Sequence, residues 1–424
     1  MSAQVYKGLV VILDGVGDRP KEVLGGLTPL EAASTPHFDR LVQEGQCGLV
    51  DPLLPGVPVD THVGTGVLLG LAPHDARKLA RGPVEAAGAG VPLQQGDVAV
   101  RCNFATIEQG PDGLRILDRR AGRISKGVNE LAASLKAVSL ADGITGSLHP
   151  ATNHRAVLRL TGRGLSGAIS DTDPGSGTSP AALRTCRALD ETAAAARTAE
   201  AVNHFVAVAY ARLAEHPVNK QREAEGLPPA NGVITRGAGS SARARNLVRH
   251  LGLRAALVSH EATVVGLGHL FHFTTISPPL NPDGGDQTEE IVAAAREALA
   301  EHDLVFVHFK SPDILSHDRD PEGKRDVLAR IDSALAPLLA DDKLVIAVGG
   351  DHASDSLSGR HIGDPVPSLL RSPGGRRDGQ SHYGESMCMS GGLGRIPASG
   401  LLWSTLDAMG VLPNIQPHAV AYFL

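Results

Sequence analysis

Three apolar segments of the chain are followed by side chains that can hold a metal ion or move a proton. The segments span residues 8–13, 304–309 and 343–348, and each has the length of a buried parallel strand. In open α/β sheets, ligands bind outside the carboxyl ends of the strands, so the residues beyond these segments are expected to converge. The candidate metal ligands there are Asp14, Asp313, His317, Asp351, His352 and His361.

Taken singly, each candidate ligand has an ordinary structural explanation. An Asp-Gly pair, as at Asp14, often forms only a turn, and Asp351 is a residue type that also caps helices. The i, i+4 spacing of Asp313 and His317 puts both on one helix face but also arises by chance. His361 alone would be a solvated loop residue. Only the joint occurrence of these residue types at strand ends indicates a site.

The number of candidate ligands favours two ions over one. Three carboxylates and three imidazoles exceed the three or four protein ligands that one catalytic metal ion usually takes. Asp and His together suit Mn²⁺, Zn²⁺ or Mg²⁺. Two such ions can clamp a phosphate, lower the pKa of a coordinated hydroxyl and stabilise both oxygens of an in-line displacement. The set therefore predicts a two-metal centre.

The elements that must position these residues are those of an α/β protein. Helices are expected over about residues 188–215 and 288–300, as crossover connections between parallel strands. From about residue 103 to 179 the sequence changes to short strand-like segments separated by Gly, Asp and Pro, which indicates a second, smaller α/β unit. These segments are residues 101–107, 113–118, 155–160 and 167–170.

The expected fold is a mainly parallel sheet with helices on both faces and an inserted domain. The predicted metal-binding core covers residues 1–103 and 200–424. The predicted insertion, which would clamp the substrate, covers residues 104–199.

Composition excludes several classes of protein. The 424 residues include 40 basic and 46 acidic side chains, and the resulting charge of -6 argues against a nucleic-acid binder and favours a small-molecule partner. The four cysteines have no C-x-x-C spacing, which argues against a disulfide scaffold, a zinc ribbon or a redox motif. The N-terminal apolar segment is too short for a signal peptide or a membrane span. A cytoplasmic enzyme is expected.

Long blocks of the sequence resemble the archaeal-type, cofactor-independent (2,3-bisphosphoglycerate-independent) phosphoglycerate mutases of the alkaline phosphatase superfamily. They run in order from residue 8 to about residue 400 and include LDGVGDRP, GLTPLEAASTPHFDRL, ARGPVEAAGAGV, GDVAVRCNFAT, NKQREAEGLPPANGVITRGAG and HFKSPDILSHDRDPEGK. The resemblance implies an alkaline-phosphatase-like core with an inserted domain. It also implies interconversion of 3-phosphoglycerate and 2-phosphoglycerate without 2,3-bisphosphoglycerate.

The resemblance also implies roles for the candidate ligands. One ion would be held by Asp313, His317 and His361. The other would be held by Asp14, Asp351, His352 and the nucleophile. The family's nucleophile is a serine in a stretch similar to S-D-T-A-H-x-x-L-L-G, and Thr61 stands at that position here.

Several residues near the nucleophile depart from the family pattern. Threonine replaces serine at Thr61, His62 replaces an aspartate, and Thr65 and Gly175 stand where the family has histidines. Threonine is still a hydroxyl nucleophile that a metal ion can activate. We therefore predict a phosphothreonine intermediate at Thr61.

Further roles are predicted outside the ligand set. Lys310 would act beside the metal ligands, and Asp173 would either handle a proton of the glycerate hydroxyls or only form a turn. A phosphorylated hydroxy acid needs cations for its phosphate and carboxylate, and arginine forks match both. For each arginine alone, a surface ion pair is the competing explanation. The candidate substrate-binding residues are Arg101, Arg119, Arg120, Arg123, His154, Arg155 and Arg236.

Two other functions remain open at this point. The departures near Thr61 also suit a phosphonyl or phosphodiester transferase or hydrolase of phosphonate metabolism, for example one that moves a phosphonate group from a nucleotide-activated donor to glycerate. A non-catalytic relative that binds metal and ligand is the third hypothesis. The retained set of six ligands and a hydroxyl counts against it.

Overall fold

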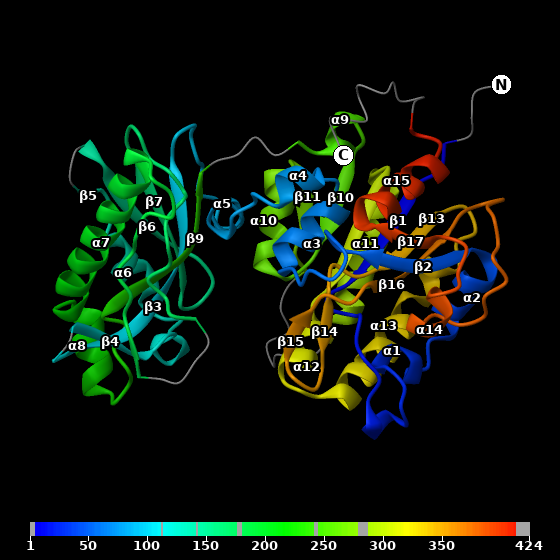
Figure 1. Cartoon of the computed structure of the whole chain (residues 1–424), viewed down its shortest axis with the longest axis horizontal. Helices are drawn as coiled ribbons and strands as arrows, with labels where there is room; N and C mark the ends of the chain where they lie inside the picture. Colours follow the sequence, from blue (N-terminus) through cyan, green and yellow to red (C-terminus); the bar gives the residue numbers. More distant parts are fainter. Residues whose placement is uncertain are drawn as a thin grey trace. The chain divides into compact units, whose positions relative to one another are not determined.

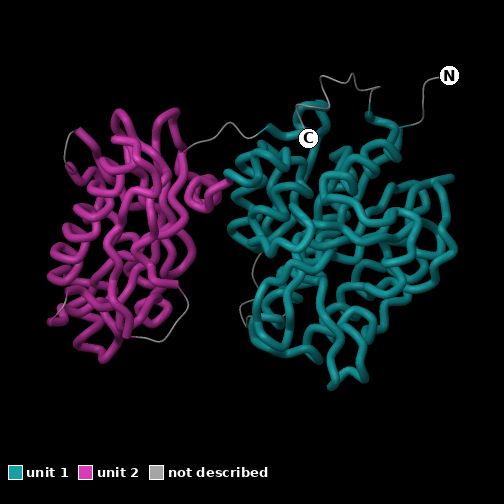
Figure 2. The backbone as a smooth tube through the Cα atoms, viewed as in Figure 1, with its two compact units in different colours: residues 1–78, 244–424 teal, residues 79–243 magenta. Residues whose placement is uncertain are grey.

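The computed structural model describes residues 5–111, 113–140, 143–175, 180–240, 245–278 and 287–412. The chain divides into two compact units, unit 1 (residues 1–78 and 244–424) and unit 2 (residues 79–243) (Figure 2). The boundaries differ from those expected, because residue 104 lies inside strand β3 (Val98–Gly110) and residue 199 inside helix α7 (Ala193–Ala214). Strand β3 pairs with other strands of unit 2 from its first residue. Unit 2 therefore begins before residue 103, where the short strand-like segments were expected to start.

The described part of unit 1 holds an eight-stranded sheet in which the candidate ligands follow central strands (Figure 1). Five neighbouring strands are parallel, β16 is antiparallel to both of its neighbours, and β17 is parallel to β2. The segments expected as strands are confirmed as β1, β12 and β13. In sheet order, the strands are β11 (Thr274–Ile276), β10 (Ala255–Val258), β12 (Leu304–Phe309), β1 (Gly8–Leu13), β13 (Val345–Gly349), β16 (Val366–Arg371), β2 (Gln46–Asp51) and β17 (Gly394–Pro397).

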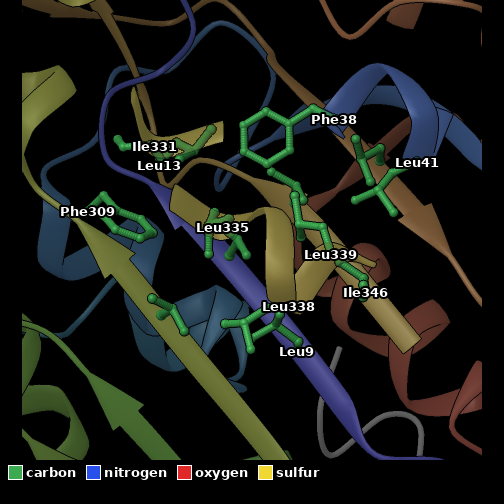
Figure 3. Packing of buried hydrophobic residues seen from close by; sticks show 14 of the residues in the cluster. Leu9, Leu13, Phe38, Leu41, Phe309, Ile331, Leu335, Leu338, Leu339 and Ile346 are labelled. Atoms are coloured by element: carbon green, nitrogen blue, oxygen red, sulfur yellow. The ribbon is translucent and has the colours of Figure 1, made fainter. Parts of the chain in front are cut away.

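Helices cover both faces of this sheet, as expected. Alternate residues of β1, such as Leu9 and Leu13, join a fully buried cluster with Phe38, Ile331 and Leu335 from helices on one face (Figure 3). Burying each such side chain contributes roughly 1.5–3 kcal/mol. That face carries α2 (Pro36–Glu44), α11 (Thr288–Glu301) and α13 (Pro321–Leu339). The other face carries α3 (Thr61–Leu68), α10 (Ala262–Leu270) and α15 (Ala398–Ala408).

Shorter elements complete the described part of unit 1. A two-stranded hairpin, β14 (Ala353–Asp355) and β15 (Arg360–Ile362), follows β13 and carries part of the candidate site. The remaining helices are η1 (Glu22–Leu24), α1 (Pro29–Ala32), α4 (Pro73–Ala76), α9 (Leu247–His250), α12 (Ser311–His317) and α14 (Glu385–Cys388).

Unit 2 is built on an antiparallel sheet, in contrast to unit 1. Its described strands are ordered β5-β6-β7-β3-β4-β8, and β9 also pairs with β3. Besides β3, they are β4 (Gly113–Asp118), β5 (Val138–Ser139), β6 (Thr145–Pro150), β7 (Arg155–Thr161), β8 (Ala181–Ala182) and β9 (Gly232–Ser240). The helices are α5 (Arg81–Gly88), η2 (Ala121–Arg123), α6 (Val128–Ala133), α7 and α8 (Pro217–Ala224).

The sequence-based expectations for unit 2 hold for three of the four strand-like segments. The segment 167–170 is not a strand, because the Ile169 N–H donates to the Gly167 carbonyl at 2.8 Å and the backbone turns there. Ile169 forms only an isolated bridge with Ala188. Helix α7 begins at Ala193 and not near residue 188, because the Thr192 side chain caps it by accepting from the Ala195 N–H. Residues 176–179 of the GSGTSP segment lie outside the described residues.

Candidate active site

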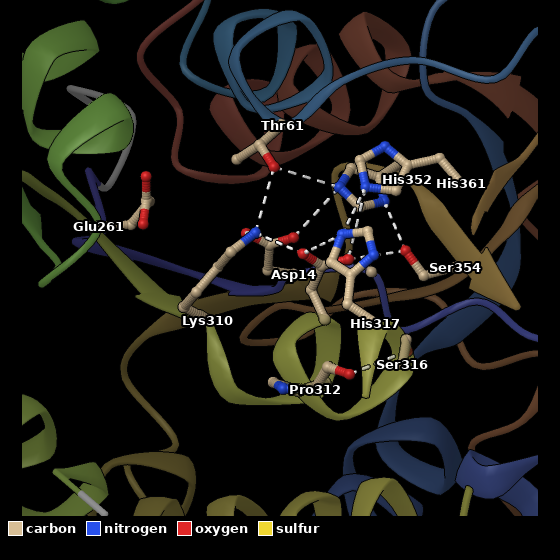
Figure 4. Close-up of polar contacts among 12 residues, drawn as sticks. Asp14, Thr61, Glu261, Lys310, Pro312, Ser316, His317, His352, Ser354 and His361 are labelled. Carbon is tan, nitrogen blue, oxygen red and sulfur yellow. Dashed lines mark hydrogen bonds and ion pairs between the residues drawn. The ribbon is translucent and has the colours of Figure 1, made fainter. Parts of the chain in front are cut away.

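The structure brings all six candidate ligands together at the carboxyl ends of the central strands of unit 1. Figure 4 labels four of them, Asp14, His317, His352 and His361. Asp14 follows β1, Asp313 and His317 lie on α12 directly after β12, and Asp351 and His352 follow β13. His361 comes from the hairpin strand β15. Together with His308, their donor atoms form three overlapping groups within 4.8 Å, which are Asp313-His317-His361, Asp14-Asp313-His352 and Asp14-His308-Asp351.

The first group presents two imidazole nitrogens to one carboxylate. The Nδ1 atom of His317 lies 2.9 Å from the Gly359 carbonyl oxygen, and that of His361 lies 2.8 Å from the Val59 carbonyl oxygen. Carbonyl oxygens only accept, so both Nδ1 atoms carry a ring proton, and in the neutral rings both Nε2 atoms carry a lone pair. The two Nε2 atoms lie 3.3 Å apart and 3.3–3.6 Å from the oxygens of Asp313. This arrangement fits a divalent cation.

The other two groups share Asp14, which has a buried carboxylate oxygen that lacks a hydrogen bond. Asp14 Oδ1 lies 3.2 Å from His352 Nε2 without the geometry of a hydrogen bond and has no other partner among the described residues. An unpaired anionic oxygen in a buried position is costly unless a cation reaches it. Asp351 is oriented by the Gly15 N–H at 3.2 Å and the Thr65 hydroxyl at 2.9 Å. These residues also fit a divalent cation.

Thr61, the first residue of α3, lies beside the candidate ligands. Its Oγ1 is 3.3 Å from His352 Nε2 and 3.3 Å from Lys310 Nζ. Helix α3 reaches this position because Gly64 packs on the end of β13, where an added Cβ would lie 1.8 Å from the Asp351 carbonyl oxygen. Any larger residue there would push α3 away from the ligands.

Lys310 places a positive charge among the carboxylates. Its Nζ donates to Asp14 Oδ2 at 2.9 Å and to Asp313 Oδ2 at 2.5 Å. Burial lowers the pKa of Lys310, but the facing carboxylates Asp14, Asp313 and Asp351 raise it well above its usual range. Burial likewise raises the pKa of Asp14, yet Lys310 and the neighbouring His308 and His352 rings hold it far below its ordinary value. Lys310 is therefore charged and lies beside the Thr61 hydroxyl.

Two residues of the site were not predicted from the sequence. Ser354, on β14, donates to Asp313 Oδ1 at 2.8 Å and lies 3.2 Å from His352 Nδ1. His308, inside β12, lies 3.0 Å from Asp14 Oδ2. His308 could have been predicted, because it lies near the end of a strand that a candidate ligand follows. Nothing in the sequence distinguishes Ser354 from other serines.

A second polar cluster lies in unit 2. Arg101 on β3 is opposite Arg236 on β9, and Asn103 is opposite Arg155 on β7. Arg101 is only 4% exposed, and its Nε and Nη1 have no hydrogen-bond partner among the described residues, nor has Arg236 Nε. Burial and the nearby Arg81 lower the pKa of Arg101 to about 9. Cationic N–H groups held together without hydrogen-bond acceptors form a site for an oxyanion.

Arg81 and Glu85 belong to this cluster and were missed in the sequence. The Nε of Arg81 donates to Glu85 Oε1 at 3.1 Å, and Arg101 Nε lies 3.5 Å from the same oxygen. Gly82 lets α5 approach β3, since an added Cβ would lie 2.1 Å from the Ala99 carbonyl oxygen. The block ARGPVEAAGAGV contains both residues and was the available signal.

The other predicted substrate residues differ in their surroundings. Arg119 holds Asp173 through two hydrogen bonds of 2.9 and 2.5 Å, so Asp173 is a partner of an arginine and not a free base. Burial, with Arg155, Arg120 and Arg101, lowers the pKa of His154 to about 4. Arg120 and Arg123 are exposed. No contact among the described residues links Arg123 to the cluster.

Comparison with known proteins identifies the family. A sequence profile described as 2,3-bisphosphoglycerate-independent phosphoglycerate mutase matches residues 42–219. Mutases of that name from Methanopyrus kandleri and Ignicoccus hospitalis are 38% and 40% identical, over 93% and 87% of this chain and 94% and 89% of their own lengths. The solved cofactor-independent phosphoglycerate mutase from Thermoplasma acidophilum is 30% identical with a TM-score of 0.68, and the match covers 96% of this chain and 100% of that chain.

The sequence comparisons and the structural comparison therefore point to the same family. The resemblance noted in the sequence is confirmed, as is the expected α/β fold class. None of the helices in the described ranges has both the length and the apolar character that a membrane crossing requires. The chain belongs to the family of 2,3-bisphosphoglycerate-independent phosphoglycerate mutases.

Proposed function

We propose that the protein interconverts 3-phosphoglycerate and 2-phosphoglycerate without 2,3-bisphosphoglycerate, with Thr61 as the phosphoryl acceptor. The observation that carries this proposal is the position of the Thr61 hydroxyl, 3.3 Å from both His352 and Lys310, in a chain of the mutase family. The compartment would be the cytoplasm and the partner a small phosphorylated hydroxy acid.

Two divalent ions, Mn²⁺, Zn²⁺ or Mg²⁺, would be held by two sets of these residues. Asp313, His317 and His361 would bind one ion. The other would be bound by Asp14, Thr61, Asp351 and His352. When bound, such ions polarise a phosphate and lower the pKa of a coordinated hydroxyl.

The residues of the chain supply the rest of the chemistry. In the first half-reaction, the Thr61 Oγ1–phosphorus bond forms and the bond between phosphorus and the 3-hydroxyl oxygen of glycerate breaks. The proton of the Thr61 hydroxyl passes to the released 3-oxygen. In the second half-reaction, the bond between phosphorus and the 2-hydroxyl oxygen forms, the Thr61 Oγ1–phosphorus bond breaks, and the proton of the 2-hydroxyl returns to Thr61 Oγ1. The Lys310 ammonium stabilises the deprotonated Thr61 hydroxyl, and the arginines around Arg101 would hold the carboxylate of the glycerate.

The comparisons do not favour the phosphonate alternative. The relatives named above are all phosphoglycerate mutases by name, and phosphonate metabolism has no support from them. The departures at Thr61, His62 and Thr65 are therefore variations within the mutase site.

The experiment is conversion of 3-phosphoglycerate by the metal-loaded protein, followed by ³¹P NMR of quenched, metal-free samples. Wild type should form 2-phosphoglycerate, Thr61→Ser should remain active, and Thr61→Ala should lose roughly 10⁴-fold or more in kcat. Mass spectrometry of the quenched protein should find phosphate on residue 61. Conversion by Thr61→Ala at the wild-type rate, or none by wild type with any of the three metals, contradicts the proposal.

A further inference from the structure

His308 and Ser259 form a buried polar pair beside the metal ligands that none of the roles above uses. His308 is 1% exposed, and Ser259 directly follows β10 and is fully buried. His308 Nε2 lies 3.0 Å from Asp14 Oδ2, and His308 Nδ1 lies 3.2 Å from Ser259 Oγ. The pair therefore connects the end of β10 to a ligand at the end of β1.

The hydrogen bonds of Ser259 fix where the ring proton of His308 lies. The Glu261 backbone N–H donates to Ser259 Oγ at 3.0 Å, so this oxygen already accepts one bond. Its own proton has one acceptor among the described residues, His308 Nδ1. Nδ1 must then carry a lone pair, and in the neutral ring the proton is on Nε2. A proton on Nδ1 would leave the buried hydroxyl of Ser259 without an acceptor.

The Nε2 proton in turn sets the orientation of Asp14. Asp14 Oδ2 accepts from His308 and from Lys310 Nζ at 2.9 Å, while Oδ1 has no hydrogen bond. The two oxygens are therefore unequal, and Oδ1 keeps its lone pairs for a cation.

We propose that His308 is a positioning residue which, held as the Nε2–H tautomer by Ser259, turns Asp14 so that Oδ1 binds the metal ion. His308 also lies with Asp14 and Asp351 in a group whose atoms are close enough to hold a cation. The competing interpretation is thus that His308 is itself a ligand. A protonated Nε2 excludes this. The inference rests on the metal centre of the proposed function and not on the identity of the substrate.

The first test is ¹⁵N NMR of the histidine ring nitrogens in the full-length protein, with the His308 signals assigned by their absence from His308→Gln. Nε2 should carry the proton, and Nδ1 should not, in both the metal-free and the Zn²⁺-loaded protein. Loss of the Nε2 proton on zinc loading, or a proton on Nδ1 in the metal-free protein, overturns the proposal.

The second test is calorimetric titration with Zn²⁺. Ser259→Ala and His308→Ala should each weaken binding at one of the two sites by roughly 10–100-fold. His308→Gln keeps an amide donor near the place of Nε2 and should restore most of the affinity. If His308 were a ligand, the glutamine variant would be as weak as the alanine variant, and the proposal would fail.

A matched control is available on the neighbouring segment. Ser277 Oγ donates to the Ser259 carbonyl oxygen at 2.9 Å and has no hydrogen bond to the ring. Ser277→Ala should therefore bind Zn²⁺ as wild type does, and a matching loss in this variant overturns the proposal. If wild type binds no zinc, the proposed function fails, whereas the NMR of the metal-free protein still tests the tautomer.

Discussion

At the scale of single residues, the site depends on hydroxyl groups that orient carboxylates. Thr65 is fully buried, and its hydroxyl donates to Asp351 Oδ2 at 2.9 Å. The family has a histidine at this position, so the threonine is a departure that still supplies a donor. The orientation of Asp351 therefore depends on one neutral hydrogen bond from α3 and one from the Gly15 backbone.

Thr65→Val should show how much that hydrogen bond contributes. Valine keeps the volume and removes the donor, so Asp351 becomes free to rotate. We expect Zn²⁺ affinity, measured by calorimetry, to fall by about 10-fold. Thr405→Val is a matched control, since this buried hydroxyl on α15 donates to the Leu401 carbonyl oxygen. Equal affinities for the two variants would contradict the role of Thr65.

A buried carboxylate outside the ligand set should make stability depend on pH. Burial raises the pKa of Glu385 to about 7, although the Thr28 hydroxyl and the Asp18 N–H donate to it. The folded chain therefore binds this proton more tightly than the unfolded chain, where the value is near 4.5. The free energy of unfolding should then fall as pH rises from about 4.5 to 7, by about 3 kcal/mol at most.

Urea unfolding of wild type and Glu385→Gln between pH 5 and pH 8 measures this effect. The glutamine oxygen can accept from the Asp18 N–H while its amide donates to Thr28, so the variant should fold. Its free energy of unfolding should change less over this range than that of wild type. Parallel pH profiles for the two proteins would show that Glu385 does not titrate in this window.

The sequence predicted the convergence of the candidate ligands better than it predicted the residues around them. Asp14, Asp313 and Asp351 follow apolar strands, and the strand pattern alone brings them to one edge of the sheet. Ser354 acts through a hydrogen bond across the site, which depends on how the β14–β15 hairpin folds back. Arg81 was missed because its role depends on the close approach of α5 to β3. Such contacts belong to the tertiary structure and leave no periodic signal.

At the scale of elements, the approach of α3 to the segment after β13 positions Thr61, the proposed nucleophile. Gly64→Ala would place a methyl group 1.8 Å from the Asp351 carbonyl oxygen, so the helix must shift. We expect a loss of roughly 1–3 kcal/mol in the free energy of unfolding and a large loss of mutase activity, because Thr61 moves with the helix.

The control for this prediction is another helical glycine of unit 1. Gly400, on α15, would meet its nearest neighbours at an ordinary 3.5 Å. Gly400→Ala should therefore be neutral or up to about 1 kcal/mol more stable, since alanine favours the helix. Urea unfolding and the NMR conversion assay compare the two variants. A Gly64→Ala protein as active and as stable as Gly400→Ala would contradict the proposed packing constraint.

Among the elements, uninterrupted apolar strands were predicted well and segments that contain glycine poorly. The buried strands β1 and β12 begin and end where the apolar runs do. The segment 167–170 has strand-like composition, but its glycine allows a turn that local composition does not reveal. Strand β9 was missed because glycines interrupt its apolar pattern.

At the scale of the whole molecule, the two units carry different chemistry. The candidate ligands all belong to unit 1 and the arginine cluster belongs to unit 2. A change in the arginine cluster should therefore alter substrate affinity and leave metal binding intact. Under the proposed function, Arg155 donates charged hydrogen bonds to the substrate, so Arg155→Ala should raise the KM for 3-phosphoglycerate by roughly 10-fold or more.

Two measurements on Arg155→Ala test whether substrate affinity can change without a change in metal binding. Calorimetry should find two Zn²⁺ sites of wild-type affinity in Arg155→Ala, while the conversion assay reports the higher KM. Arg163→Ala, which changes an exposed arginine of unit 2, should match wild type in both. A wild-type KM for Arg155→Ala would remove this residue from the substrate site.

The order of strands in unit 1 also determines when that unit can fold. Its central strand β1 is made first, but both of its neighbours, β12 and β13, come from residues 304–309 and 345–349. Unit 2, by contrast, is one continuous stretch of chain. During synthesis, unit 2 can therefore fold before the two strands that pair with β1 have been made. We expect the slow phase of refolding to be the pairing of β1, with the metal ligands assembled last.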